Sequence, residues 1–503
     1  MLIMKWKTDN EGRLVATWIA VQKISKPGLP DQPAAQREIA PRREMRQPRH
    51  SSPLNKAGLC WTMPMRLRRL LKNCCVGALF PVFLFCLPVH GQDSSPDPPV
   101  TPGSRFSDPQ FQATLTGQGV FPFPAQYSGP NSLDPNGQIR DTFSFDITDS
   151  FRPWGGGELY FDGLVWQGYG LSNTEGIAAF PNGEAYRVGT TPPDAVIARA
   201  YLQQTVNLGG DAKSTSPKAP RRLIFTVGHF AATDIFDQNA YANDSRTQFM
   251  NWAFINNLTW DYPANTLGIT NGISAELDWG GWAARAGIFQ VSEVANGIRM
   301  DWNIARAWSA AGELQRNFSF AGHHGAVRLL AWKDRAHMGS YQGVLSNPQD
   351  ITQNGFLEYR TKYGFGINAE QEICKDLGVF MRLGWGNGRT QVWEFTDVDR
   401  TASLGVSLKG AAWHRPRDTV GIAAVVDGIT AVHQQFLAHG GLGITVGDGA
   451  LDYGSERVGE TYYDWNIVKH LWLTLDYQIA QNPGYNHARG PASILATRLH
   501  WEF

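Results

Sequence analysis

Cysteine is scarce in this 503-residue chain and is nearly confined to its start. Four of the five cysteines, Cys60, Cys74, Cys75 and Cys86, lie within the first 91 residues. Cys374 alone follows them, so the remaining chain cannot form an intramolecular disulfide, whatever the redox state of its compartment.

The chain also lacks an overall excess of charge, with 45 Lys+Arg and 45 Asp+Glu, but the two signs are unevenly spread. Residues 1–91 contain 15 basic and 5 acidic side chains, so the rest of the chain carries a net charge of about −10. An acidic chain of this kind is not a candidate for binding nucleic acid.

Long apolar runs are missing as well. After residue 91, no run approaches the roughly 20 residues that a membrane-spanning helix needs. The apolar run at 74–89 is shorter than this, contains Pro81 and Pro88, and follows a basic stretch. That layout is typical of a secretory signal peptide, with cleavage expected just after Gly91.

Domain boundaries follow from these features. A signal peptide stands at the start of a chain, so we predict that residues 63–91 are the signal peptide and that residues 1–62 are a misassigned start or a disordered extension. Residues 92–106 are rich in Pro and Ser and indicate a flexible lead-in. Residues 107–503 contain no second linker, and a unit of this size is large for one soluble domain.

Motifs for catalysis or metal binding are absent from the sequence. His323 with His324, and His433 with His439, lack neighbouring cysteines and HExxH spacing, and Asp448 lies in a Gly/Asp turn that does not match an EF-hand. No nucleophile elbow, phosphate-binding loop or dinucleotide-binding glycine motif is present. We therefore predict no catalytic residue, no cofactor and no metal, although the many carboxylates leave a glycosidase-type pair open.

The chain does have stretches in which apolar and polar residues alternate, most clearly at its C-terminus. One set of alternate positions is apolar and ends on an aromatic ring: Leu495, Thr497, Leu499, Trp501 and Phe503. The other set is Ala496, Arg498, His500 and Glu502. A period of two gives a strand with one apolar and one charged face. A soluble sandwich could show this pattern, but a terminal aromatic ring suits the interface girdle of an outer-membrane barrel with a wet lumen.

The same pattern recurs throughout residues 107–503. It predicts strands at 142–149, 158–166, 195–208, 223–228, 267–279, 282–290, 308–318, 325–333, 363–372, 377–385, 392–396, 403–409, 419–426, 462–467 and 471–479, before the last one. The polar faces carry charges and hydroxyls that a dry sandwich core could not hold unpaired. In lipid, only a closed barrel satisfies the backbone groups of strands. We therefore predict an all-β fold, a transmembrane antiparallel β-barrel of about 16 strands.

Several stretches stand out together: the long polar loops at 228–252, 260–268, 447–456 and 482–491, the segment RAYLQQT at 199–205, and the terminal Phe503. In combination they resemble the OprB-type carbohydrate-selective porins of Gram-negative outer membranes. The resemblance covers about residues 111–503. It implies a sixteen-stranded barrel in the outer membrane, an inward-folded constriction loop, and passive diffusion that prefers small sugars. The terminal Phe also resembles the signal read by the barrel-assembly machinery.

A pathway for sugars needs hydrogen-bonding groups and aromatic rings along a wet lumen. The segment 234–252 offers this mixture and is our candidate for the constriction loop, although a structured external loop is an alternative reading. Its candidate pathway residues are Asp234, Asp237, Asn239, Asp244, Arg246 and Trp252. Further candidates, each of which could instead brace the barrel wall, are Asp261, Tyr262, Glu313, Arg328, Arg382, Trp413 and Arg415.

The leading hypothesis is thus an outer-membrane channel for small carbohydrates, surrounded by membrane lipid. The alternatives are an outer-membrane or secreted hydrolase of glycans or lipids, and a barrel that conducts nothing. Strand patterning does not distinguish a monomer from a homo-oligomer.

Overall fold

The structure, a computed structural model, describes residues 2–8, 14–20, 105–185, 194–209, 221–346 and 357–503. The chain divides into two units, residues 1–91 and 92–503. In the first unit, β1 (Leu2–Thr8) pairs antiparallel with β2 (Leu14–Ala20). The predicted signal peptide and almost all of the predicted lead-in lie outside the described residues, so these boundaries stay predictions.

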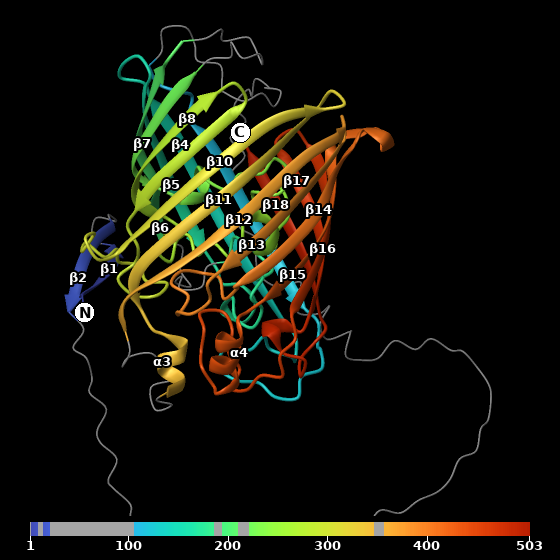
Figure 1. The fold of residues 1–503 in the computed structure, drawn as a ribbon. Helices are drawn as coiled ribbons and strands as arrows, with labels where there is room; N and C mark the ends of the chain where they lie inside the picture. Colours follow the sequence, from blue (N-terminus) through green and yellow to red (C-terminus); the bar gives the residue numbers. More distant parts are fainter. Residues whose placement is uncertain (1, 9–13, 21–104, 186–193, 210–220, 347–356) are drawn as a thin grey trace, which may run out of the picture. The chain divides into compact units, whose positions relative to one another are not determined.

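The second unit is a closed barrel in which every strand is antiparallel to both of its neighbours (Figure 1). The strands follow one another around the ring in chain order, and the ring closes where the last strand pairs with the first. They are β3 (Gln110–Val120), β4 (Gln138–Phe151), β5 (Gly157–Gln167), β6 (Asp194–Asn207), β7 (Arg222–Phe230), β8 (Thr270–Trp279), β9 (Trp282–Phe289), β10 (Trp308–Phe320), β11 (His323–Met338), β12 (Glu358–Cys374), β13 (Leu377–Gly386), β14 (Arg400–Gly410), β15 (Arg415–Gly428), β16 (Glu456–Val468), β17 (Leu471–Gln481) and β18 (Ala492–Glu502).

The predicted all-β barrel and its number of strands are confirmed. In β18, Leu495 and Leu499 are 48% and 40% exposed, whereas Arg498 and His500 are buried on the opposite face. The apolar face therefore points outward and the charged face inward, as the alternation predicts. No helix among the described residues is both long and apolar enough to cross a membrane.

Two details differ from the prediction. β3 is absent from the predicted strands, because Gly117 and Gly119 occupy outward positions where bulky apolar residues would reveal the alternation. The predicted strand at 392–396 is wrong, since this segment lies in the loop between β13 and β14. There the N–H groups of Trp393 and Glu394 donate to the Asp261 carboxylate, at 2.7 and 2.8 Å, instead of to a neighbouring strand.

The two ends of the barrel differ in the length of their connections. At the short-turn end, two-residue turns such as 280–281 and 321–322 join neighbouring strands. The C-terminus lies at this end, where the N–H of Glu502 donates to the carbonyl of His470 at 3.1 Å. The long-loop end is opposite and carries α3 (Tyr341–Ser346) and α4 (Ala431–Ala438) (Figure 1).

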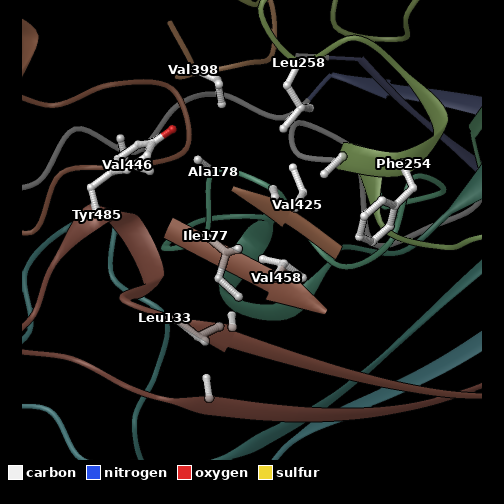
Figure 2. Close-up of a cluster of buried hydrophobic side chains, with 14 of the residues drawn as sticks. Leu133, Ile177, Ala178, Phe254, Leu258, Val398, Val425, Val446, Val458 and Tyr485 are labelled. Atoms are coloured by element: carbon white, nitrogen blue, oxygen red, sulfur yellow. The ribbon is translucent and has the colours of Figure 1, made fainter. Parts of the chain in front are cut away.

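Several of the long loops pack together into a buried apolar cluster (Figure 2). Leu133, Ile177, Phe254 and Val446 come from four different loops, and Tyr485 comes from a fifth. They meet inward-facing side chains of the wall, among them Phe380, Val425 and Val458. Because these loop residues contact the inner wall, much of the lumen beside β13–β18 is filled by side chains.

Candidate functional site: a charged passage beside β4, β5 and β6

The loop between β7 and β8, residues 231–269, is the longest element inside the barrel and is called here the long inner loop. Asp237 fastens it to the wall. The fully buried Arg382 of β13 donates to the Asp237 carboxylate at 3.1 Å and to its carbonyl at 3.0 Å. Asn368 of β12 donates to the same carboxylate at 2.7 Å, and Glu313 of β10 accepts the Asp237 N–H at 2.8 Å.

The opposite side of the long inner loop is fastened to β16 and β18. The Glu460 carboxylate accepts the N–H groups of Met250 and Asn251 at 2.6 and 3.0 Å. Arg498 donates to the carbonyls of Ser245 and Gln248 at 2.6 and 2.8 Å. Buried charges on strands far apart around the ring thus hold the loop across the lumen, since each finds its partners in the loop backbone.

Glycines of the wall let the long inner loop approach closely. A Cβ atom on Gly366 would lie 2.3 Å from the Asn257 amide, and one on Gly384 would lie 2.4 Å from the Thr259 hydroxyl. Any larger side chain at these two positions would displace the loop from β12 and β13.

A third anchor joins the long inner loop to the loop between β13 and β14. Lys362 of β12 donates to the Asp261 carboxylate at 3.0 Å, and both groups are buried. The same carboxylate accepts the backbone N–H of Glu394, a residue of the loop between β13 and β14. Burial, together with the charge of Asp261, raises the pKa of Glu394 well above its ordinary value.

A second inner loop, described for residues 168–185, follows β5. Gln118 of β3 and Gln478 of β17 each donate to the carbonyl of Pro181 at 2.9 Å. The Glu456 carboxylate accepts the N–H groups of Ala178 and Ala179 at 3.1 and 2.8 Å. This loop therefore lies beside the long inner loop within the lumen.

The two inner loops leave a cavity of about 510 Å³ against β4, β5 and β6. On the wall side it is lined by Asp162 and Arg199, and on the loop side by Asp234, Arg246 and Trp252. A second cavity of about 230 Å³ shares Thr148 and Tyr160 with it and continues to Arg152 beside a short turn. The two cavities follow one side of the barrel and are together called here the passage.

Opposite charges alternate along this passage. Arg199 donates to Asp162 on the wall at 2.7 Å and to Asp234 on the long inner loop at 2.6 Å. Arg246 on the loop pairs with Asp146 of β4 at 3.1 Å and with Glu184 of the second inner loop at 2.9 Å. Burial disfavours the charge of Arg246, but Glu184, Asp146 and Asp244 together outweigh it, so the pKa of Arg246 lies above its ordinary value.

Aromatic rings border the same charges. Trp252 stacks on Phe180, with ring centres 5.0 Å apart, and Tyr262 lies 5.3 Å from Phe395. Farther along the passage Tyr160 of β5 stacks on Tyr201 of β6 at 5.0 Å. The passage thus offers ionised hydrogen-bonding groups beside flat apolar faces, the combination that binds hydroxylated rings.

A β-bulge aims Arg199 into the lumen. Asp162 of β5 is opposite Arg199, whereas the next residue, Gly163, is opposite Ile197, so Ala198 is extra in β6. Ile197 is 54% exposed on the outer face. An extra residue in one strand shifts the alternation, and here it places both Ala198 and Arg199 on the inner side.

The predicted pathway residues fall into three groups. Those that line the larger cavity are Asp234, Asp244, Arg246, Trp252 and Tyr262. Those that are buried in contacts between the loops and the wall, or within the wall, are Asp237, Asn239, Asp261, Glu313, Arg328 and Arg382. Trp413 and Arg415 lie at the short-turn end against the outward rings of Tyr463 and Trp465, and neither lines the two cavities described above.

Several lining residues were not among the candidates. Asp162 and Arg199 lie on the polar sides of predicted strands, so alternation alone could have found them. Glu184, Phe180 and Phe395 belong to loops, and no local pattern shows which loop residues turn inward. Among the described residues, no group of three potential ligands could hold a metal ion.

A closed, outward-apolar barrel of sixteen strands with a charged internal passage defines a porin-type protein of the bacterial outer membrane. The profile of the family described as "Carbohydrate-selective porin, OprB family" matches residues 130–503, and the chain belongs to this family.

Individual relatives are distant. The chain is 27% identical to Porin B of Pseudomonas aeruginosa over 29% of this chain and 33% of that protein. It is 24% identical to Porin AaxA of Chlamydia trachomatis over 41% of this chain and 40% of that protein, so it spans well under half the length of each. The high-pH structure of Pseudomonas putida OprB shares the fold, with a TM-score of 0.61, 17% identity, and coverage of 79% of this chain and 94% of that one.

Proposed function

We propose that this protein is a passive channel for small carbohydrates, which cross through the passage beside β4, β5 and β6. The observation that carries the proposal is the juxtaposition of paired charges with aromatic faces in that passage. A neutral sugar can exchange hydrogen bonds with Arg199 and Arg246 while its apolar face lies on Trp252.

The long inner loop is the proposed constriction. It is fixed to the wall at three places, so its inward edge holds Asp234 and Arg246 opposite the wall charges. Carboxylates and guanidinium groups that face each other create a transverse field, which hinders ions of one sign more than uncharged polyols. The same wall-facing charges give no reason to propose catalysis, because each carboxylate in the pairs already has a cationic partner.

Liposome swelling across mono-, di- and trisaccharides tests this proposal. We expect swelling rates to fall steeply with sugar size, and Trp252→Ala to reduce the sugar preference relative to a polyol of equal mass. Trp302→Ala is a matched control, because Trp302 is 80% exposed in the loop between β9 and β10. Folded protein that admits no solute would instead support a non-conducting barrel, and turnover of a glycan panel would support a hydrolase.

The orientation and assembly of the barrel belong to the same proposal. We infer that the short-turn end faces the periplasm and that Phe503 serves as the signal for barrel assembly. Its N–H and carbonyl both bond to Phe111 of β3, and the two rings stack at 5.1 Å, so the terminal residue lies at the closure of the ring. Deleting Phe503 should lower the yield of folded protein in cells far more than refolding in detergent.

A further inference from the structure

We propose that the outer surface of β10–β12, near the long-loop end, binds the phosphorylated head group of a membrane glycolipid. The site consists of Arg306, Lys333 and Arg335 and is called here the outer basic patch. It is separate from the sugar passage, since all three side chains lie outside the lumen.

The alternation of buried and exposed residues along β11 shows which way the side chains of Lys333 and Arg335 point. Arg328, Trp332 and Asp334 are buried and face the lumen, whereas Leu329 is 51% exposed and faces outward. Lys333 and Arg335 share the face of Leu329, because each lies an even number of residues from it. On a membrane barrel this face meets lipid, so two cations stand where apolar side chains are the rule.

Aromatic rings mark the depth of the patch. Trp308 of β10 is directly opposite Arg335, and Tyr363 of β12 is directly opposite Lys333. The Lys333 ammonium lies 5.8 Å from the centre of the Trp308 ring, and the Arg306 guanidinium lies 5.7 Å from that of Tyr359. Outward Trp and Tyr residues gather where the hydrocarbon core meets the polar head groups, so the cations lie at head-group level.

Within the part of the chain that the structure describes, the positive charge of the patch has no ion-pair partner. Among the described residues, no carboxylate forms an ion pair with Arg306, Lys333 or Arg335. The Arg335 guanidinium also donates to the backbone carbonyl of Arg306 at 3.1 Å, which holds it beside the Arg306 backbone. By contrast, the exposed Arg222 of β7 has Asp278 at 2.8 Å. Like charges held close at a membrane surface are stabilised by an external anion.

A phosphorylated glycolipid fits these surroundings. Its phosphate accepts hydrogen bonds from several guanidinium and ammonium groups at once. Its acyl chains would lie on the outward apolar residues next to the patch, such as Leu329 and Ile288, which is 65% exposed. Its sugar ring would find flat faces in Tyr359, beside Arg306, and in Trp302, four residues earlier in the same loop.

The test measures binding of lipid A, a bisphosphorylated diglucosamine lipid, to the purified full-length protein in uncharged detergent. We expect the double variant Lys333→Gln/Arg335→Gln to bind about tenfold more weakly or worse. Arg316→Gln is the matched control, because Arg316 also faces outward, over the Trp282 ring at 5.0 Å, but at the short-turn end. We expect it to bind within about twofold of the unchanged protein. Heat-modifiable mobility on gels verifies that each variant is folded.

Four results would overturn the proposal. The double variant could bind lipid A as well as the unchanged protein does. Lipid A stripped of its phosphates could bind equally well, which would indicate purely apolar contact. Inorganic phosphate could displace the lipid at equal concentration, which would indicate a site for a soluble anion. Cross-linking from the patch to a second copy of the chain would identify a protein interface instead.

Discussion

The two sides of the lumen are built from the same kind of strand but have opposite interiors. Beside β13–β18, loop residues such as Phe254 and Tyr485 pack against Val425 and Val458, and the space is filled (Figure 2). Beside β4, β5 and β6 the wall presents Asp162 and Arg199 to a cavity of about 510 Å³. The barrel is therefore narrowed because its loops pack against most of the wall and leave a cavity beside β4, β5 and β6.

The difference indicates that the charged side chains inside the barrel have two separate roles. Arg382 and Arg498 on the filled side hold loop backbone, and both are fully buried. Arg199 and Arg246 on the open side have partners but also line the cavity. Charges of the first kind should determine stability, and charges of the second kind should determine what passes.

The largest effect is expected from Arg382→Met on the filled side. This change leaves the Asp237 carboxylate buried without its cation, which should lower the free energy of unfolding by about 3–5 kcal/mol. Chemical unfolding in detergent measures it. Arg222→Met is the control, because its exposed ion pair with Asp278 should contribute about 1 kcal/mol or less. Equal losses of unfolding free energy in both variants would contradict these separate roles.

A smaller loss of stability, but a clear change in conductance, is expected from Gly384→Val. The added side chain would collide with Asn257 and Thr259. Overpacking of this kind costs about 1–3 kcal/mol, and it should push the long inner loop away from β13 toward β5 on the opposite side of the ring, which narrows the passage. Single-channel conductance should fall, whereas Gly459→Ala, where a Cβ would have ordinary contact at 3.6 Å, should leave it unchanged. Unchanged conductance in Gly384→Val would show that the loop does not limit the passage.

The next effect depends on pH and concerns the long-loop end of the filled side. Burial raises the pKa of Asp399, but its hydrogen bonds to His433 of α4, at 3.2 Å, and to the N–H of Thr430, at 2.8 Å, together with the charges of His433 and Lys362, outweigh burial, so the net pKa is below the ordinary value. A carboxyl with a depressed pKa adds stability above its unfolded pKa of about 4, and this contribution is lost as pH falls through the folded pKa.

The measurement compares the unfolding of Asp399→Asn with that of the unchanged protein between pH 7 and pH 3. The unchanged protein should lose more stability over this interval than the variant, by up to about 2 kcal/mol. If the free energy of unfolding falls equally with pH in both proteins, Asp399 does not contribute to the loss of stability in acid.

The smallest effect on stability, and the sharpest on selectivity, is expected from Arg199→Gln on the open side. Removing this cation leaves Asp162 and Asp234 facing the passage, so the cation-to-anion permeability ratio should rise about twofold or more. The reversal potential in a salt gradient measures the ratio. Arg316→Gln, outside the lumen, is the control. An unchanged permeability ratio in Arg199→Gln would show that ions do not cross through the passage.

Much of the fold was predictable because one face of each strand meets lipid. That environment enforces a period of two, which the sequence displays openly in β13, β17 and β18. The exceptions have local causes: glycines hide the alternation of β3, and residues 392–396 alternate by composition while Asp261 binds their backbone.

The site was less predictable, because a side chain on the inner face can either line a cavity or hold a loop. Asp234 and Asp237 are three residues apart in one polar segment, yet the first lines the passage and the second is buried under Arg382. Which of these occurs depends on how loops from distant parts of the chain meet, and local sequence does not encode that meeting.

Because β18 pairs with β3, the barrel closes only when its first and last strands are both present. Until those two edges meet, each of the two edge strands exposes a free row of N–H and C=O groups, which hydrocarbon cannot solvate. A chain that stopped one strand early would not form a slightly smaller pore but an open ribbon prone to aggregate. Closure of the ring therefore requires the final hairpin of β17 and β18.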